Sequence, residues 1–286
     1  MNELPHPRIA PPSLRMPQRS LYQSSGAVNA PPVGMVPLLS ESKISVSWAR
    51  HQDEVRQAQQ LRYQVFALEM GANLPRTLPG HDIDRFDDYC EHLLVRDVAS
   101  QQVIGTYRVL TPTQARRAGS TYSDTEFDLT RLQSLRERMV ELGRSCVHAG
   151  HRHGGVILAL WGALAEFMAR NQLDTMIGCA SIPMQHNGVY GGHAAASIWR
   201  QVSKTHLASD DYRVSPRLAL PVERLDDSLE VEPPALIKGY LRLGAKVLGA
   251  PAWDPDFNSA DLPMMMRIAD LPARYRKHFS NHPAGV

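Results

Sequence analysis

The sequence is poor in cysteine, and it has no strong excess of charge of one sign. Its 286 residues include three cysteines, Cys90, Cys146 and Cys179, which are too few and too scattered for a disulfide framework or a four-cysteine zinc site. We expect each to be a small buried apolar residue, and a reducing cytoplasm is the simplest compartment. Lys and Arg total 31 against 29 for Asp and Glu, so the net charge of +2 does not favour nucleic acid as a partner.

Long apolar runs are also missing. The most apolar stretch, residues 156–168, contains Glu166 and is shorter than the roughly 20 residues that a membrane-spanning helix needs. We therefore do not expect an integral membrane protein.

The first 40 residues are poor in acids and lack an uninterrupted apolar run. They contain many of the 21 prolines in the chain, but one acid, Glu3, and no uninterrupted apolar core of the kind found in a signal peptide. Such a segment cannot bury enough apolar surface to offset its ordering entropy. We predict a disordered proline-rich tail over residues 1–40 and one folded domain over residues 41–286.

The first part of the predicted domain alternates strand and helix patterns. Residues 44–48 alternate apolar and polar side chains, as a half-buried strand does. The next segment has apolar residues at spacings of three and four, which predicts an amphipathic helix with one apolar face: Val55, Ala58, Leu61, Val65 and Leu68. Strands over 92–97 and 103–110 form a predicted hairpin. Residues 71–90, between helix and hairpin, are a long loop rich in aspartate, and long loops in compact domains usually carry function.

The second part predicts a strand–helix–strand unit. A strand over 140–147 leads through a glycine-containing turn into an apolar helix over 156–170, and a further strand covers 175–180. This order is typical of parallel strands joined by a crossover helix. A second helix over 235–248 and a final strand over 262–268 complete a single mixed α/β domain.

The turn before the predicted helix 156–170 suits a phosphate. A helix that begins directly after a strand points free backbone N–H groups and the positive end of its dipole at a ligand. The turn supplies His151, Arg152, Gly154 and Gly155. It matches neither a Walker loop nor a dinucleotide fingerprint, because the required glycine and lysine spacings are absent.

Two other interpretations of this region are weaker. A metal site could use His148, His151, His153 and Cys146, but no second ligand pair occurs at a standard spacing. Nucleophilic catalysis could use Cys146 with His148 as its base. Cys146 lies inside an apolar strand pattern, which is more typical of an inert buried thiol.

Four motifs in the first half of the domain resemble the acyl-homoserine lactone synthases and their relatives, which belong to the GNAT superfamily of N-acyltransferases. They are Arg62–Phe66 (RYQVF), Asp84–Asp87 (DRFD), Gly105–Leu110 (GTYRVL) and Glu141–Arg144 (ELGR).

Later motifs are more specific. They are similar to the ornithine-acyl[acyl carrier protein] N-acyltransferases, the hemolysin-like branch of the superfamily: Leu160–Gly162 (LWG), Ile177–Ser181 (IGCAS), Leu236–Ala245 (LIKGYLRLGA) and Asp256–Asp261 (DFNSAD). The resemblance covers about residues 44–279. The superfamily's phosphate loop is incomplete here, because the frame at His151 has Val156 in its last position and the frame at Arg152 has Ile157.

The resemblance implies a fold and a reaction. The fold is a mixed α/β GNAT acyl-CoA N-acyltransferase fold with a carboxy-terminal extension. The reaction transfers a (3-hydroxy)acyl chain from acyl carrier protein to the α-amine of L-ornithine and gives lyso-ornithine lipid. The donor is the acyl-phosphopantetheine of the carrier, and neither a permanently bound cofactor nor a metal is expected.

The resemblance also implies roles for individual residues. Glu141, as general base, and Arg144 are the expected catalytic residues, and a backbone N–H near residues 146–148 is the expected oxyanion donor. His151, Arg152, Gly154 and Gly155 form the expected acyl-donor phosphate loop. Substrate binding is assigned to Arg62, Phe66, Asp84, Asp87 and Arg108. Because isolated buried charge is costly, we expect the arginines of these motifs to pair with Asp84 and Asp87.

A basic stripe predicts a docking surface. Lys238, Arg242 and Lys246 are spaced by four residues and would share one face of the predicted helix 235–248. Such a stripe suits an acidic acyl carrier protein or, by peripheral contact, an anionic inner membrane. We expect a cytoplasmic enzyme. The alternatives are an N-acyl amino acid synthase, an acyl-homoserine lactone synthase that uses S-adenosylmethionine, and a non-catalytic acyl- or lipid-binding module.

Overall fold

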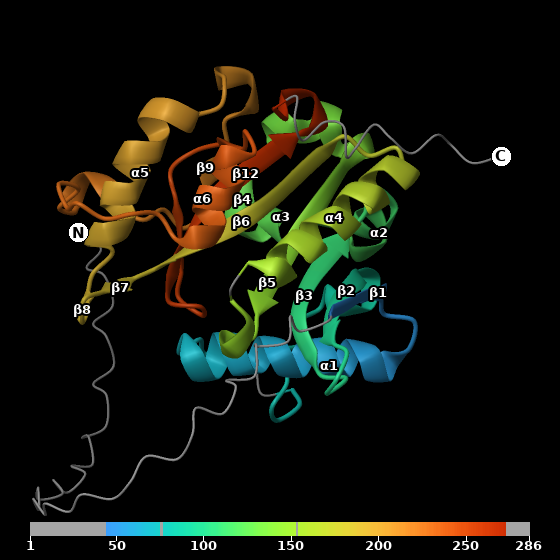
Figure 1. The fold of residues 1–286 in the computed structure, drawn as a ribbon. Coiled ribbons are helices and arrows are strands. Elements are labelled where there is room, and N and C mark those ends of the chain that lie inside the picture. The colour runs from blue at the N-terminus through green and yellow to red at the C-terminus, as the bar shows by residue number, and fades with distance from the viewer. Residues whose placement is uncertain (1–43, 75–76, 153, 273–286) are drawn as a thin grey trace, which may run out of the picture. The chain divides into compact units, whose positions relative to one another are not determined.

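The computed structural model of the chain describes residues 44–74, 77–152 and 154–272 (Figure 1). The predicted tail over residues 1–40 and residue His153 lie outside these ranges.

The described part is built on an eight-stranded mixed sheet. Its strand order is β1-β2-β3-β5-β6-β12-β10, and β11 also pairs with β12. Among the described strands of this sheet, β5 and β6 run parallel and the other pairs run antiparallel. The strands are β1 Ile44–Trp48, β2 Glu91–Asp97, β3 Val103–Leu110, β5 Met139–Val147, β6 Thr175–Pro183, β10 Lys246–Val247, β11 Ala252–Asp254 and β12 Ser259–Arg267.

The first predicted helix changes from α-helical to π-helical geometry near its end. Helix α1 (Gln52–Tyr63) continues into a π-helical turn η1 (Gln64–Glu69). The wider turn rotates the residues that follow it relative to an α-helical pattern. Phe66 is therefore buried, whereas Leu68 is 68% exposed, so the prediction that Leu68 lies on the apolar face is wrong.

The predicted hairpin and the strand–helix–strand unit are both present. Strands β2 and β3 pair antiparallel, and β5, helix α4 (Gly155–Arg170) and β6 form the parallel crossover. The pairing of β5 with β6 ends early, since it runs from Met139 opposite Thr175 to Glu141 opposite Ile177. Beyond this point the two strands diverge and a cavity begins between them.

The helix predicted over 235–248 is shorter than expected. Helix α6 covers Ala235–Arg242, and residues 246–247 instead form strand β10 against β12. Gly244 has φ +91°, and the N–H of Ala245 donates to the carbonyl of Tyr240. A glycine in the left-handed conformation commonly ends a helix, so Gly244 was a sequence signal for the end of α6.

The remaining elements complete the described part. They are α2 Pro112–Ala118, α3 Ser123–Glu126, α5 His193–His206, the small pairs β4 Phe127–Asp128 with β9 Ser215–Pro216 and β7 Gln185–His186 with β8 Val189–Tyr190, and the 3-10 turns η2 Asp87–Tyr89, η3 Thr130–Arg138, η4 Ala149–His151, η5 Asp210–Tyr212, η6 Val222–Arg224 and η7 Ile268–Asp270.

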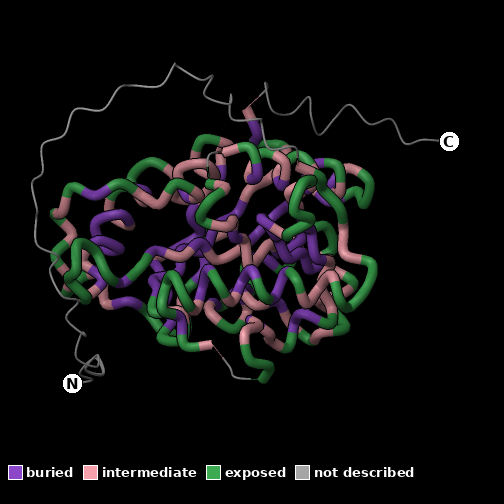
Figure 2. The backbone as a smooth tube through the Cα atoms, turned by 60° about the horizontal axis from the view of Figure 1, so that its bottom comes forward, coloured by how far each residue is buried: buried purple, intermediate pink, exposed green. Residues whose placement is uncertain are grey.

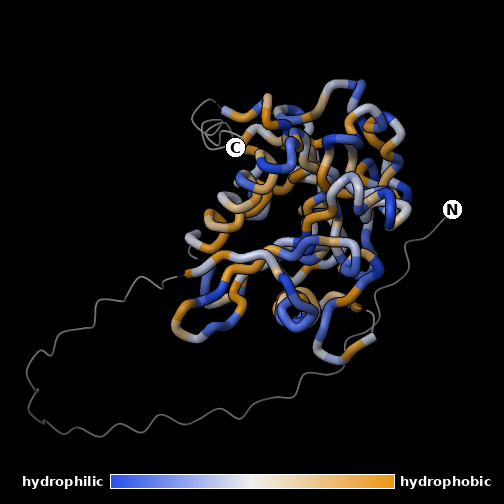
Figure 3. The backbone as a smooth tube through the Cα atoms, turned by 90° about the vertical axis from the view of Figure 1, so that its right-hand side faces the viewer, coloured by the Kyte–Doolittle hydropathy of each residue, from blue (hydrophilic) through white to orange (hydrophobic). Residues whose placement is uncertain are grey.

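Apolar side chains cover both faces of the sheet. Alternate residues of β6 point to opposite sides, so Met176 packs with α4, whereas Ile177 packs with residues such as Phe127 and Leu132. A further cluster joins α5 and α6 to β6 and β12. Buried residues fill the centre of the described part (Figure 2), and hydrophobic and hydrophilic positions alternate along much of the backbone (Figure 3). No helix within the described ranges has both the length and the apolar character to cross a membrane.

Candidate active site

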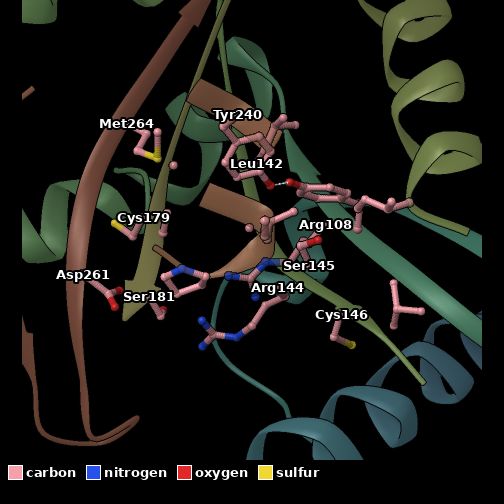
Figure 4. Close-up of a pocket in the computed structure, with 18 of the residues that line it drawn as sticks. Arg108, Leu142, Arg144, Ser145, Cys146, Cys179, Ser181, Tyr240, Asp261 and Met264 are labelled. Carbon is pink, nitrogen blue, oxygen red and sulfur yellow. Dashed lines mark hydrogen bonds between the residues drawn. The ribbon is translucent and has the colours of Figure 1, made fainter. Parts of the chain in front are cut away.

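A cavity of about 630 Å³ opens where β5 and β6 diverge (Figure 4). Its walls come from both strands, from β12, from α4 and α6, and from the π-helical turn η1. Seven of the residues selected from the sequence line it: Phe66, Arg108, Glu141, Arg144, His151, Arg152 and Gly154. Arg62, Asp84, Asp87 and Gly155 do not line it, nor do the three residues of the basic stripe.

Arg144 lies in the cavity wall in an unusual backbone conformation. Its φ is +51°, and the β3–β5 register shifts beside it, between Thr106 and Arg108. Its guanidinium group lies 4.9 Å from the centre of the Tyr122 ring and 4.5 Å from that of the Phe257 ring. Strained backbone of this kind persists where surrounding contacts fix it, and it is concentrated at functional sites.

A buried network joins three arginines to three aspartates. Arg62 Nε donates to Asp82 at 2.7 Å. Arg108 Nη1 donates to Asp84 at 2.6 Å and to Asp87 at 3.1 Å. Arg144 donates to Asp82 at 3.2 Å and to Asp84 at 3.0 Å.

The network contains the pairing expected from the sequence and one further acid that the motifs did not indicate, Asp82. Burial alone would raise the pKa of Asp87, but the charge and hydrogen bonds of Arg62 outweigh it and hold that pKa well below its ordinary value. The pKa of Asp84 is also lowered, because Arg108 and Arg144 outweigh its burial. Both carboxylates are therefore ionised at neutral pH, and the network fixes the aspartate-rich loop to α1, β3 and β5.

Glu141 has two contacts that the sequence did not indicate. It is 5% exposed, and its two carboxylate oxygens accept the backbone N–H groups of Tyr122, at 2.7 Å, and Ser123, at 2.6 Å. These N–H groups lie at the start of α3, so the carboxylate holds this segment against the sheet. Burial raises the pKa of Glu141 despite these hydrogen bonds. Glu141 also lines the cavity.

The turn before α4 lies at another part of the cavity. Gly154 precedes the helix with φ +98°, and α4 begins at Gly155. Arg152 donates from Nε to the carbonyl of Val147 at 2.9 Å and from Nη2 to Glu69 at 2.6 Å. The nearby Cys146 is buried, and burial raises its pKa to about 12, so it is a neutral thiol at physiological pH. Across the described ranges, no three His, Cys, Asp or Glu residues are arranged to hold a metal ion.

The predicted basic stripe is wrong as a helical face. Lys238 and Arg242 lie on α6, and Lys238 lies 3.4 Å from Glu232. Lys246 lies on β10 beyond the helix end at Arg242. The four-residue spacing therefore does not place Lys246 beside the other two.

Three acids in the cavity wall were missed by sequence reasoning, and one of them, Glu69, is paired with Arg152. Asp254 ends β11, and Asp261 lies on β12. Asp261 belongs to the motif that begins at Asp256, but acidic residues in a strand-and-turn segment give no signal of their position until the strand pairing is known.

Comparison with known proteins identifies the family. A model of the acetyltransferase (GNAT) domain matches residues 61–162. The chain is 32% identical to an L-ornithine N(alpha)-acyltransferase of Brucella abortus (strain 2308) over 277 residues, which are 92% of this chain and 95% of the relative. It is 34% identical to an L-ornithine N(alpha)-acyltransferase of Rhizobium meliloti (strain 1021), over 81% of this chain and 82% of the relative. The chain belongs to the L-ornithine N(alpha)-acyltransferase family.

Membership in the L-ornithine N(alpha)-acyltransferase family makes the chain an acyltransferase with a mixed α/β GNAT fold, as expected from its motifs, rather than a non-catalytic module. Similar solved structures include the acyl-homoserine lactone synthase LasI, at 14% identity and a TM-score of 0.48, over 86% of this chain and 98% of that one. FeeM, an N-acyl amino acid synthase from uncultured soil microbes, matches at 10% identity and a TM-score of 0.45, over 82% of this chain and 99% of that one.

Proposed function

We propose that the chain transfers a (3-hydroxy)acyl group from the phosphopantetheine thioester of acyl carrier protein to the α-amine of L-ornithine, which gives lyso-ornithine lipid. The observation that carries the proposal is the mixed lining of the cavity between β5 and β6. It combines long apolar side chains, among them Trp161, Met264 and Met266, with charged groups, among them Glu141 and Arg144. An acyl chain suits the apolar side chains and an amino acid the charged groups. The names of the relatives support ornithine as the acceptor.

The donor would enter along the diverging strands. Beyond Glu141, the inner edge of β5 is no longer paired with β6, so its backbone groups are available to a thioester. A backbone N–H in this region would stabilise the oxyanion. The turn at His151, Arg152 and Gly154 and the start of α4 would bind the phosphate, because a helix start offers free N–H groups to an anion.

Glu141 would act as the general base. The α-amine of an amino acid is mostly protonated at neutral pH, and it must lose a proton before or during attack. The raised pKa of Glu141 makes its carboxylate a stronger base than an exposed one. The ammonium first loses one proton to solvent. The neutral amine nitrogen then bonds to the thioester carbon and gives a second proton to Glu141, the carbon–sulfur bond breaks, and Glu141 passes this proton to the leaving thiolate of the carrier, which leaves an amide N–H.

The carrier would approach over α6. Lys238 and Arg242 remain on this helix and would contact an acidic partner or the surface of an anionic inner membrane. Lys246, on β10, is no longer tied to them by helical spacing, and we leave it out of the proposed docking surface.

A direct assay tests the proposal. The purified chain is incubated with 3-hydroxyacyl carrier protein and L-ornithine, and the products are analysed by mass spectrometry. We expect an amide of ornithine and free carrier thiol in equal amounts. A second reaction replaces ornithine with S-adenosylmethionine. A lactone from the second reaction, with no amide from the first, would contradict the proposal and favour a homoserine lactone synthase.

A further inference from the structure

Three carboxylates lie close to one another at or beside the charged part of the cavity, and none is ion-paired with a cation of the described chain. They belong to Asp254, Asp261 and Glu126. Asp254 is 5% exposed and Asp261 is 3% exposed, and both line the cavity. Within residues 44–74, 77–152 and 154–272, none of the three forms a salt bridge with Arg, Lys or His.

The neighbouring acidic residues, in contrast, are paired with arginine. These are Asp82, Asp84 and Asp87. Arg144 is close enough to Asp261 to influence it, but its hydrogen bonds go to Asp82 and Asp84. Since buried charge is costly unless it is compensated, an acidic group of this kind is best satisfied by a cation supplied from outside the chain.

The titration of the group agrees with this view. Burial and the charge of Asp254 raise the pKa of Asp261 to about 6. Burial and the charges of Asp254, Asp261 and Asp256 raise the pKa of Glu126 to about 7. The acids therefore repel one another in the free protein, and a positive charge between them would relieve the repulsion.

The fold holds two of the acids in fixed positions. Asp261 lies opposite Ser181 across the β12–β6 pair and accepts a hydrogen bond from the hydroxyl of Ser259 at 2.9 Å. Asp254 accepts hydrogen bonds from the hydroxyl of Tyr122 at 3.0 Å and from the backbone N–H groups of Asp256 at 2.9 Å and Phe257 at 3.0 Å, all of them neutral donors. Figure 4 shows Asp261 beside Ser181, with the guanidinium group of Arg144 on the same side of the cavity. Serine and tyrosine hydroxyls orient these carboxylates without neutralising them.

We propose that Asp261, together with Asp254, binds the side-chain ammonium of the acceptor and so selects α-amino acids with a cationic side chain over neutral ones. This assignment rests on the proposed function, because it concerns the acceptor of the same reaction. An ammonium group has three donors and can bind both carboxylates at once. The nearby guanidinium of Arg144 offers a partner for the α-carboxylate, so one end of the cavity matches the charges of a diamino acid.

The test compares L-ornithine with L-norvaline, which has the same carbon skeleton but no side-chain ammonium. We measure kcat and KM for both amino acids in the native chain, in Asp261→Asn and in Asp211→Asn, an exposed acid that does not line the cavity. A site built to bind a polar group strongly rejects an analogue that lacks it. We expect the native chain to prefer ornithine by at least about 100-fold in kcat/KM.

In Asp261→Asn the KM for ornithine should rise by about 10- to 100-fold, and kcat/KM for norvaline should change by less than about threefold. Asp211→Asn should leave both values unchanged. An equal loss for the two amino acids in Asp261→Asn, with a native melting curve, would overturn the assignment. Asp254→Asn provides a second variant in case Asp261→Asn does not fold.

Assays of the native chain alone distinguish a failure of the proposed ammonium site from a failure of the proposed acyl transfer. Acylation of ornithine and norvaline with similar kcat/KM would overturn the ammonium site and leave the proposed acyl transfer intact. Failure to acylate either amino acid would overturn the proposed function, and the ammonium site with it.

Discussion

Arg62 binds Asp87 through two parallel hydrogen bonds of 2.8 Å, one from each terminal nitrogen of the guanidinium to a different carboxylate oxygen. Arg62 is fully buried and Asp87 is 5% exposed. This bidentate pair joins α1 to the 3-10 turn η2, so the aspartate-rich loop is fixed at a point that does not touch the cavity. Arg62 was expected to bind substrate, and its position instead suits a residue that positions Asp82 and Asp87.

Replacing Arg62 by lysine should destabilise the fold although the charge is kept. An ammonium group cannot reproduce the two parallel bonds to Asp87 and the bond to Asp82. Breaking a buried ion pair typically costs about 3–5 kcal/mol, so we expect the melting temperature to fall by more than about 5 °C. Differential scanning calorimetry checks this, with Arg116→Lys as the exposed control. Equal melting temperatures in Arg62→Lys and the native chain would contradict the structural role.

The network should also make the fold sensitive to acid. Because the folded-state pKa values of Asp84 and Asp87 are lowered, these groups stabilise the fold at pH values above their ordinary pKa near 4. This stability is lost as pH falls below about 4 and the carboxylates take up protons. Urea denaturation at a series of pH values should show this loss as a decrease in the free energy of unfolding. The free energy of unfolding should depend less steeply on pH in Asp87→Asn than in the native chain. An equally steep pH dependence in the variant would exclude Asp87 as a cause.

Glu141→Gln should lower both turnover and stability. Loss of a general base typically lowers kcat by about 10²- to 10⁴-fold. The amide of glutamine has one acceptor oxygen for the two N–H donors of Tyr122 and Ser123, and a buried donor without a partner costs about 1–3 kcal/mol.

The two effects of Glu141→Gln can be separated by measuring kcat well below the melting temperature of the variant. A large loss of kcat in protein that is still fully folded supports the base. Native kcat would exclude it and leave Glu141 with its contacts to the start of α3.

Binding of ornithine should strengthen as pH rises through about 6. Asp261 must be ionised to bind an ammonium, and its pKa in the free protein is raised to about 6 by burial and by Asp254. Glu126 and Asp256 add negative charge near it, and Arg144 opposes them. Calorimetric titration between pH 5 and pH 7.5 should show increasing affinity for ornithine and a nearly constant affinity for norvaline. The same pH dependence for both amino acids would exclude Asp261 as its origin.

Gly239→Ala should disturb the apolar part of the cavity. A Cβ at Gly239 would lie 2.6 Å from the Trp161 ring, so either the ring or α6 must move. Both Trp161 and Tyr240 line the cavity, and the Tyr240 hydroxyl is hydrogen-bonded to that of Tyr107. We expect a cost of about 1–3 kcal/mol and a weaker preference for long acyl chains, measured with donors of different length.

Gly162→Ala is the matched control for this substitution. It also lies in a helix, but a Cβ there would meet no atom within 4 Å. Alanine is the better helix former, so Gly162→Ala should be neutral or slightly stabilising. If both variants behave alike, crowding against Trp161 is not the cause of the effect.

The elements and the arginine network could be predicted because each leaves a local pattern. Apolar residues at spacings of three and four predicted α1, and a glycine-containing turn followed by an apolar run predicted α4. Charged residues inside apolar motifs predicted that Arg62, Arg108 and Arg144 would need acidic partners. The exposure of Leu68 could not be predicted, because the π-helical turn η1 changes the number of residues per turn and its amino-acid composition gives no sign of this.

The second acidic group could not be predicted for a different reason. Asp261 faces Ser181 because β12 pairs with β6, and Asp254 meets Tyr122 across a sequence separation of 132 residues. These neighbours depend on strand order, which the local sequence does not contain. Glu141 was selected by its motif, but its contacts with residues 122–123 depend on the same tertiary arrangement.

Asp254 and Asp261 lack the arginine partners that the other acidic group has, and this lowers the stability of the free enzyme. In the folded state, the pKa of Asp261 lies above the ordinary value of 3.8, so the fold loses stability as pH rises from about 4 to about 6 and this carboxyl ionises. At neutral pH the empty protein therefore carries an electrostatic strain that a bound cation would remove. Selectivity for a charged acceptor and maximal stability are then opposing demands on the same two side chains, Asp254 and Asp261.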